Sequence, residues 1–235
     1  MAAAETLFNK HFEWLFEDEA LEAADPGTVD WEEFRRDLQR CPEIAFHKGG
    51  YFRVCALQFA LIAPGVTLEI IEELLEVNPK AINEYARRYQ WDTVNWVRVH
   101  HQLYNLSPEI LRVLLERRPE FIAHETTDLD MMTEAPVFDY IDGDVNEYTE
   151  VIFETSPHAV ALVLAFHFLR REDVVCDKVL TFALDRALTL EREGRGVFTM
   201  RVKHSSHEEF CLLRVLFRDL NSANSELCDR YLRVF

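Results

Sequence analysis

The chain has 235 residues and is 49% hydrophobic, which is enough length and apolar content to bury a core and excludes a wholly disordered protein. Its formal net charge of −17 argues against nucleic acid as a partner, because binding to phosphates depends on a surplus of Lys and Arg. The 5 cysteines include no Cys-x-x-Cys pair, so we expect free thiols in a reducing compartment, cytoplasmic or nuclear, and neither a disulfide framework nor a zinc site.

The first predicted element is an amphipathic, aromatic-rich helix from Glu5 to Ala24. Its apolar residues fall on overlapping faces, and they are Leu7, Phe8, Phe12, Leu15 and Phe16. The sequence Asp25-Pro-Gly then breaks the helix. We interpret residues 1–29 as an N-terminal capping helix that shields the first of several repeats.

A helix that ends at a proline recurs four times. The prolines are Pro42, Pro79, Pro119 and Pro157, and they are 37, 40 and 38 residues apart (79−42, 119−79, 157−119). Proline stops a helix because it cannot donate the next backbone hydrogen bond and disfavours helical geometry in the residue before it. A period of this length is typical of stacked helical repeats.

These four helices begin at Asp30, Thr67, Ser107 and Val145, and the first three of those residues are common helix caps. Aligned on the prolines, the helices share one mostly apolar stripe, made of Phe34, Leu38, Ile71, Leu74, Leu75, Leu111, Leu114, Leu115, Thr149, Ile152 and Phe153. Another apolar segment precedes three of the helices, over Tyr51 to Ile62, Trp91 to Tyr104 and Pro136 to Ile141. Each repeat is therefore predicted as two antiparallel helices with a loop, and the fold as an all-α solenoid.

The chain resembles the ankyrin repeat, whose first helix usually carries a Thr-Pro-Leu-His-x-Ala signature. Cys55-Ala56-Leu57-Gln58-Phe59-Ala60 keeps the Leu and the Ala, and Glu134-Ala135-Pro136-Val137-Phe138 keeps the Pro and an aliphatic residue after it. The segments Leu68 to Glu76 and Pro108 to Glu116 are similar to the family's second helix. The resemblance covers Asp30 to Leu169 and implies ankyrin-like repeats over residues 30–169. HEAT or armadillo repeats, whose period is about 40–47 residues, are the alternative.

The resemblance also bears on the loops and on the binding surface. The glycine that normally opens each ankyrin finger is missing, so we expect loops that do not form regular hairpins. The resemblance implies that a partner contacts the first helices and the loops before them, which are Tyr51 to Gln58, Gln90 to His101 and Asp128 to Phe138.

Residues 170–235 are predicted as a C-terminal helical segment packed on the repeats. A hydrophobic helix runs to about Leu169, and others are expected over Asp173 to Arg192, Glu208 to Leu220 and Ser225 to Phe235. Between them, Gly194-Arg-Gly196 predicts a turn. Phe198, Met200 and Val202 alternate with polar residues, as in a short strand.

The stretch from Pro119 to Leu169 contains 11 acidic residues and no Lys or Arg. It is either a solvated acidic face or an electronegative patch that steers a basic segment of a partner. Asp142-Gly-Asp144-Val-Asn146 imitates the start of an EF-hand calcium loop, but Phe153 stands where a bidentate Glu is required, so we predict no metal site. His204 and His207 would share a helical face, without a third ligand nearby in sequence.

We therefore predict a non-enzymatic protein-interaction scaffold or adaptor without cofactor or metal, whose partner is a protein with a basic patch. Neither nucleic acid nor a membrane is expected as a partner, because no segment approaches the ~18 apolar residues of a membrane span. The candidate partner-binding residues are Trp91, Trp96, Asp128, Asp130, Asp142 and Asp144. One alternative is an acidic inhibitor that imitates a polyanion and occupies a nucleic-acid-binding protein. Another is a helical enzyme of unrecognised type, marked by a deep apolar pocket with convergent polar groups.

Overall fold

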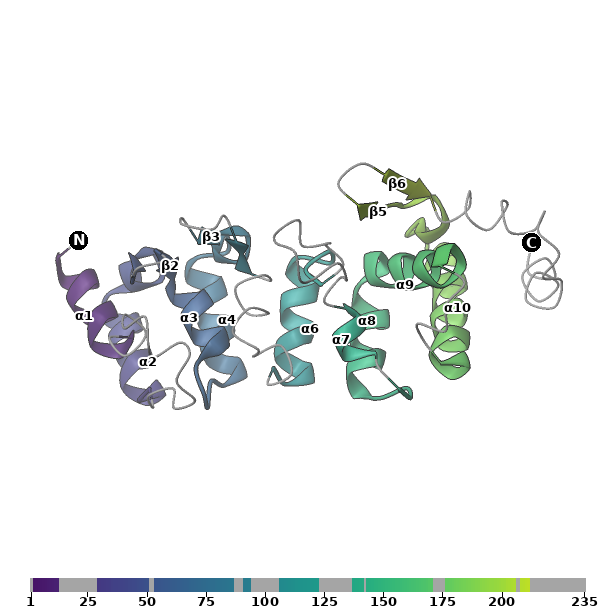
Figure 1. The fold of residues 1–235 in the computed structure, drawn as a ribbon. Coiled ribbons are helices and arrows are strands. Elements are labelled where there is room, and N and C mark those ends of the chain that lie inside the picture. The colour runs from purple at the N-terminus through teal and green to yellow at the C-terminus, as the bar shows by residue number, and fades with distance from the viewer. Residues whose placement is uncertain are drawn as a thin grey trace, which may run out of the picture. The chain divides into compact units, whose positions relative to one another are not determined.

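The fold is mostly helical in a computed structural model of the chain (Figure 1). The structure describes residues 2–12, 29–50, 53–86, 91–93, 106–122, 137–141, 143–170, 176–205 and 208–211. The chain divides into two compact units, Met1–Leu114 and Leu115–Phe235, which we name the N-terminal unit and the C-terminal unit.

The described elements of the N-terminal unit alternate helices with two short hairpins. In chain order they are α1 (Ala2–Phe12), α2 (Trp31–Arg40), a 3-10 helix (Pro42–Phe46), β1 (Lys48–Gly49), β2 (Val54–Cys55), α3 (Ala56–Ile62), α4 (Leu68–Val77), a 3-10 helix (Ala81–Asn83), β3 (Tyr85–Ala86) and β4 (Trp91–Asp92). Helix α6 (Pro108–Arg117) crosses the division between the units.

The described elements of the C-terminal unit are mainly helices. They are α7 (Val137–Tyr140), α8 (Glu147–Thr155), α9 (Pro157–Arg170), α10 (Asp177–Arg192), a 3-10 helix (Val197–Thr199), β5 (Arg201–Ser205) and β6 (Glu208–Cys211). Helix α10 packs on α8 and α9, and β5 contacts α9. Among the described residues, no helix is long and apolar enough to cross a membrane.

The prediction of four helices that end at prolines is confirmed. They are α2, α4, α6 and α8, and each ends two residues before its proline. In three of them the residue before the proline donates its N–H to the carbonyl four residues earlier, at 2.9 Å from Cys41, 2.9 Å from Asn78 and 2.8 Å from Ser156. The whole predicted stripe is buried. A buried stripe and a proline stop thus occur together in each of these helices.

Two of the predicted caps also hold. The Asp30 carboxylate accepts a hydrogen bond from the Glu33 N–H at 2.9 Å, and the Ser107 hydroxyl accepts one from the Ile110 N–H at 3.3 Å. Thr67 makes no such bond to its helix. The fourth helix begins after Asn146 rather than at Val145, because the Asn146 amide oxygen accepts the Thr149 N–H at 3.0 Å.

The prediction that the loops lack regular hairpins is wrong for the N-terminal unit. In the first hairpin Lys48 pairs with Cys55, and in the second Tyr85 pairs with Asp92, so the same register returns after 37 residues (85−48, 92−55). That interval equals the spacing of Pro42 and Pro79. Both hairpins lie at the upper end of the unit in Figure 1, beside the helices that they connect.

Other errors occur where strands replace predicted helix. Trp91 and Asp92 form β4 and Thr93 after them is helical, whereas the rest of the predicted segment, residues 94–104, lies outside the described residues. At the other end of the chain, Glu208–Cys211 form β6, so the helix predicted from Glu208 is wrong at its beginning. The predicted strand over Phe198 to Val202 begins only at Arg201 and includes His204, so the two histidines do not share a helix.

Polar contacts join segments that lie 33 to 37 residues apart in the sequence. In the N-terminal unit, Trp31 donates to the Pro64 carbonyl and Asn78 to the Ala45 carbonyl, both 33 residues away and at 3.0 Å. In the C-terminal unit, the Ser156 hydroxyl bonds to the Pro119 carbonyl, 37 residues away. The Asn78 and Ser156 contacts tie the ends of α4 and α8 to the turns that follow α2 and α6, and the Trp31 contact ties the start of α2 to the loop before α4.

Replacement of Asn78 by alanine should lower the free energy of unfolding by about 1–2 kcal/mol, because Asn78 is 5% exposed and its loss leaves the buried Ala45 carbonyl without a donor. Urea unfolding followed by circular dichroism would measure this. Asn83→Ala is the matched control, since Asn83 is exposed. Equal effects of the two variants would contradict a specific role for the bond.

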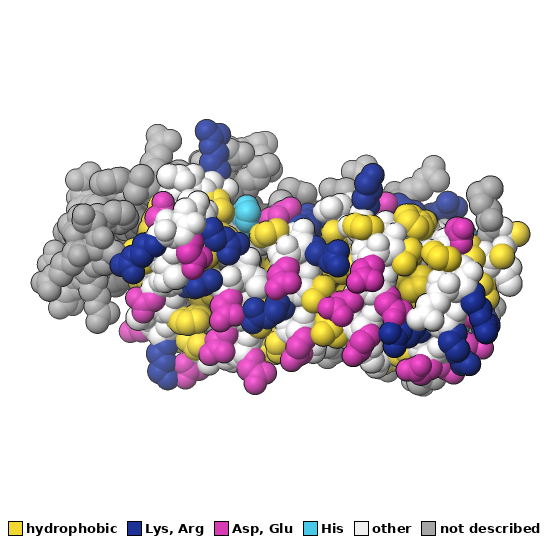
Figure 2. Space-filling model, turned by 180° about the vertical axis from the view of Figure 1, so that it is seen from behind, with side chains coloured by type: hydrophobic (Ala, Val, Ile, Leu, Met, Phe, Trp, Pro, Cys, Tyr) yellow, Lys and Arg dark blue, Asp and Glu magenta, His cyan; other side chains and the backbone are white. Residues whose placement is uncertain are grey.

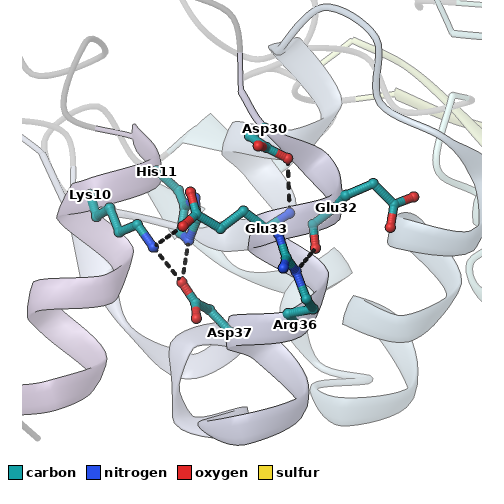
Figure 3. Close-up of polar contacts among 7 residues, drawn as sticks. All are labelled: Lys10, His11, Asp30, Glu32, Glu33, Arg36 and Asp37. Carbon is teal, nitrogen blue, oxygen red and sulfur yellow. Dashed lines mark hydrogen bonds and ion pairs between the residues drawn. The ribbon is translucent and has the colours of Figure 1, made fainter.

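Helix α1 is held against α2 by aromatic and polar contacts. The centroid of the Phe12 ring lies 5.1, 5.3 and 5.2 Å from the ring centroids of Phe8, Phe34 and Phe59, respectively. On the polar side, Asp37 of α2 accepts from Lys10 at 2.8 Å and from His11 at 3.0 Å (Figure 3). The rest of the predicted capping helix, residues 13–24, lies outside the described residues.

Candidate functional site

Most of the predicted partner-binding residues lie outside the part of the chain that the structure describes. These are Trp96, Asp128, Asp130 and Asp142. Trp91 belongs to β4, where it pairs with Ala86 in the second hairpin of the N-terminal unit. Asp144 is described in the C-terminal unit, on the loop before α8.

The Asp144 carboxylate forms an ion pair with a lysine. Its Oδ2 lies 2.6 Å from Lys178 Nζ of α10, and the Lys178 hydrogen bond, followed by one from the Val145 N–H, lowers the pKa of Asp144. The pair is exposed, with 62% of the Asp144 side chain and 73% of the Lys178 side chain accessible. Exposed pairs of this kind stabilise a fold little.

Two arginines that follow the acidic stretch in sequence also form hydrogen bonds with it, at the end of α8. Arg186 of α10 donates to the Phe153 and Glu154 carbonyls at 3.0 and 3.1 Å, and Arg195 donates to the Thr155 carbonyl at 3.4 Å. On the face shown in Figure 2, acidic and basic side chains are interspersed over the described residues. The electronegative patch that the sequence predicts is therefore partly balanced where the structure describes it.

The N-terminal unit has a hollow of about 440 Å³ that α1 and the first hairpin line together. We name it the hairpin hollow, and its lining residues are Glu5, Asn9, His47, Lys48, Gly49, Gly50 and Arg53. Glu5 and Asn9 come from α1, His47 lies between the 3-10 helix and β1, and the others come from β1 and the turn of the hairpin. Two permanent cations and one carboxylate face this space, in a chain whose net charge is −17.

The wall of the hollow is fixed from both sides. The His47 ring packs against Phe8 with centroids 4.8 Å apart. Lys48 forms an ion pair with Glu84, which lies directly before the second hairpin. The fully buried Gln58 accepts the Cys55 N–H at 3.0 Å and donates to the Glu84 carbonyl at 3.3 Å. Together these contacts hold the two hairpins in one arrangement.

Arg53 has an unusual backbone conformation at the hairpin turn. Its φ of +55° is the one positive φ of a non-glycine residue in the described chain, and its N–H donates to the Gly50 carbonyl at 3.2 Å. A side chain in this left-handed region costs about 1–2 kcal/mol relative to glycine. The Arg53 side chain is exposed and has no ion pair with any described residue. The turn thus retains a strained residue whose charge is available to a ligand.

The charges in the hollow act on His47. Burial lowers the pKa of His47, the nearby Glu5 carboxylate raises it, and the Arg53 guanidinium lowers it further. His47 is therefore neutral near pH 7 and can donate or accept a hydrogen bond. The influence of both Glu5 and Arg53 on one ring indicates that the two charges lie close to it.

Phe46 is an apolar residue beside the hollow in sequence, and its ring is not among the lining residues. It directly precedes His47, and at 57% exposure it is the exposed large hydrophobic side chain among the described residues. Exposed aromatic rings beside polar groups are common at sites of protein contact. The described part of this region thus offers an exposed aromatic ring, an imidazole, and a guanidinium without an ion pair to any described residue.

Replacement of Arg53 by glycine is expected to raise the free energy of unfolding by about 1 kcal/mol, because glycine adopts positive φ without strain. The gain is limited because glycine also makes the unfolded chain more flexible. Urea unfolding of the variant tests this, with Arg53→Ala as the comparison that keeps the strain. A glycine variant less stable than the alanine variant would contradict it.

The sequence predicts only some of the residues that line the hairpin hollow as contact residues. Arg53 falls within Tyr51 to Gln58, one of the segments implied by the ankyrin resemblance, whereas Glu5 and Asn9 were assigned only to a cap. The Gly49-Gly50 pair is a turn signal that could have located the hairpin. Among the described residues, no group of three or more metal-binding side chains comes together.

Comparisons of the chain with protein-family models, with curated proteins and with solved structures gave no match.

Proposed function

We propose that this chain is a non-enzymatic protein-interaction module built from ankyrin-like helical repeats. The observation that carries the proposal is the return of the same hairpin register after 37 residues, between consecutive second helices α2 and α4. A helix pair with a projecting hairpin, repeated at a fixed interval, presents a surface of hairpins and first helices. HEAT and armadillo repeats consist of helices without such hairpins, which favours the ankyrin-like alternative.

The contacts between repeats support the same proposal. Within each unit, polar contacts join residues separated by about one period, including Arg35 with Glu73, 38 residues apart, and Lys178 with Asp144, 34 residues apart. Repeat proteins are held together in this way because each repeat buries its apolar face against its neighbours. In this proposal residues 30–169 form the stacked repeats, residues 1–29 cap them and residues 170–235 pack on their end.

The partner in this proposal is a protein, which contacts the hairpins and first helices and, through a basic patch, the acidic stretch. Trp91, Trp96, Asp128, Asp130, Asp142 and Asp144 are the proposed contact residues. The alternative of a polyanion mimic is supported less well, because it calls for a continuous one-sided row of carboxylates. Lys178 beside Asp144 and the interspersed charges of Figure 2 interrupt such a row.

Affinity capture from native lysate, followed by kinetics with the captured protein, tests the proposal. Reversal of Asp128, Asp130, Asp142 and Asp144 to Lys should slow association about tenfold or more at low salt, because steering depends on these charges. The matched control reverses four exposed acidic residues at other helices, Glu76, Glu116, Asp185 and Glu193, and should leave the rate nearly unchanged.

The outcomes separate the parts of the proposal. Equal slowing by both variants would mean that only net charge matters, and no slowing by either would remove the acidic stretch from the interface. If the intact chain retains no protein at low or high salt, the proposed function itself is wrong.

A further inference from the structure

We propose that the hairpin hollow binds a segment of the partner that carries an Asp or Glu side chain next to an apolar residue. The inference rests on the proposed function, because it assigns a partner segment to one surface of the interaction module. In this arrangement the carboxylate pairs with Arg53 and the apolar residue packs on Phe46.

The choice of a carboxylate follows from the charges that line the hollow. Lys48 is paired with Glu84, whereas Arg53 is exposed and has no ion pair among the described residues. A guanidinium binds a carboxylate through two parallel hydrogen bonds, which gives it both strength and direction. Glu5 on the opposite wall repels a second carboxylate, so the acidic side chain of the segment is directed towards Arg53.

The backbone conformation of Arg53 is a second, independent reason to place the ligand contact at this residue. Its φ of +55° is a conformation that glycine would adopt without strain, and the preceding turn residue Gly50 does adopt φ of +70°. Strained residues of this kind are concentrated at ligand sites, where the side chain is needed. The neighbouring wall of the hollow is held in place, since His47 packs on Phe8 and Lys48 is paired with Glu84.

A peptide fits this surface better than a nucleic acid does. A chain with a net charge of −17 repels a polyanion, and the two cations that line the hollow release too few counterions to hold a phosphate backbone. A single carboxylate on a mostly neutral segment meets no such barrier. The hollow of about 440 Å³ is large enough for a few side chains.

Selection of a random-peptide display library on the full chain, with fluorescence anisotropy on the selected peptides, tests the inference. We expect the peptides to be enriched in Asp or Glu beside an apolar residue. Arg53→Ala should weaken their binding about tenfold or more, and Arg53→Lys should weaken it less. Arg36→Ala is the matched control, because Arg36 is an exposed arginine of the same unit that is bonded to the Glu32 carbonyl of its own helix and is not a lining residue of the hollow.

The Arg53→Gly variant shows whether weaker binding is caused by the loss of the guanidinium or by a loss of folding. This variant should unfold at a higher urea concentration than Arg53→Ala and still bind as weakly, so stability and binding change in opposite directions. Phe46→Ala should weaken binding without changing the preference for acidic peptides.

Selected peptides without an excess of carboxylates, or with equal affinity for Arg53→Gly and the intact chain, would overturn the inference and leave the module function standing. The same holds if a protein captured from lysate binds Arg53→Gly as tightly as it binds the intact chain. Arg53-dependent binding of a labelled single-stranded oligonucleotide would assign the hollow to nucleic acid. If neither peptides nor lysate proteins are retained, both the inference and the proposed function fail.

Discussion

Replacement of Phe12 by alanine is expected to lower the free energy of unfolding of the N-terminal unit by about 3–5 kcal/mol. Phe12 is fully buried and joins three elements, because its ring contacts Phe8 of α1, Phe34 of α2 and Phe59 of α3. Its stacking on Phe59 is nearly parallel, with an interplanar angle of 13°. Truncation would leave a cavity that these ring systems cannot fill without moving α1.

Urea unfolding and hydrogen exchange measure this effect. Phe46→Ala is the control, because Phe46 is 57% exposed and its removal should change stability by no more than about 0.5 kcal/mol. Exchange should rise first at the α1 amides if α1 detaches as a cap. Similar losses in the two variants, or unchanged exchange in α1, would contradict the interpretation that α1 caps the first repeat.

The Phe12 variant also separates the cap from the binding surface. Glu5 and Asn9 line the hairpin hollow from α1, so detachment of this helix removes one wall. Arg53 and Phe46 belong to the hairpin and the 3-10 helix before it, which α1 does not contain. Peptide affinity should therefore fall in Phe12→Ala while the dependence on Arg53 remains.

The sequence predicted the proline-terminated helices well because every signal for them is local. Asp30 supplies a cap, Phe34 and Leu38 supply the buried stripe, and Pro42 follows the end of α2. The same combination occurs in α6 with Ser107 as the cap, whereas α4 and α8 share the stripe and the proline but lack a bond from the expected cap residue. Helix α10 was also predicted to within a few residues of its beginning, for the same reason.

The hairpins could not be predicted in this way. A strand of two residues such as Lys48–Gly49 has no alternation to detect, and it exists because Val54–Cys55 comes back beside it. The start of β6 shows the same effect at Glu208, where pairing with β5 overrides a helical pattern. Tertiary pairing, which a periodicity analysis does not contain, decides these segments.

The candidate site depends on two further properties that the sequence does not show. The positive φ of Arg53 is set by the hairpin turn and cannot be inferred from an Arg in a loop. The balance of charge at Asp144 depends on Lys178, which lies 34 residues later on another helix. The pairing of Asp144 with Lys178 could therefore not be inferred from the charges along the acidic stretch.

Replacement of Asp37 by alanine is expected to lower the free energy of unfolding by about 1–3 kcal/mol, because it leaves the His11 ring nitrogen, 3% exposed, without its partner. Lys10 first, and then His11, lower the pKa of Asp37 by hydrogen bonding to its carboxylate (Figure 3). A lowered pKa in the folded state means that the carboxylate stabilises the fold at pH values above its ordinary pKa of 3.8. That contribution is lost as the pH falls through the folded-state pKa.

The pH dependence distinguishes this ion pair from a packing effect. Titration of Asp37 should not change the stability difference between the intact chain and Asp37→Ala from pH 7 to about pH 5. The difference should shrink below pH 3.8. Glu33→Gln is the control, since Glu33 binds the same Lys10 at 2.9 Å but is 43% exposed, and its loss should change stability by no more than about 0.5 kcal/mol. If the stability difference between the intact chain and Asp37→Ala persists unchanged at pH 3, Asp37 acts by filling space. If Asp37→Ala and Glu33→Gln lower stability equally, the buried His11 contact does not hold α1 on α2.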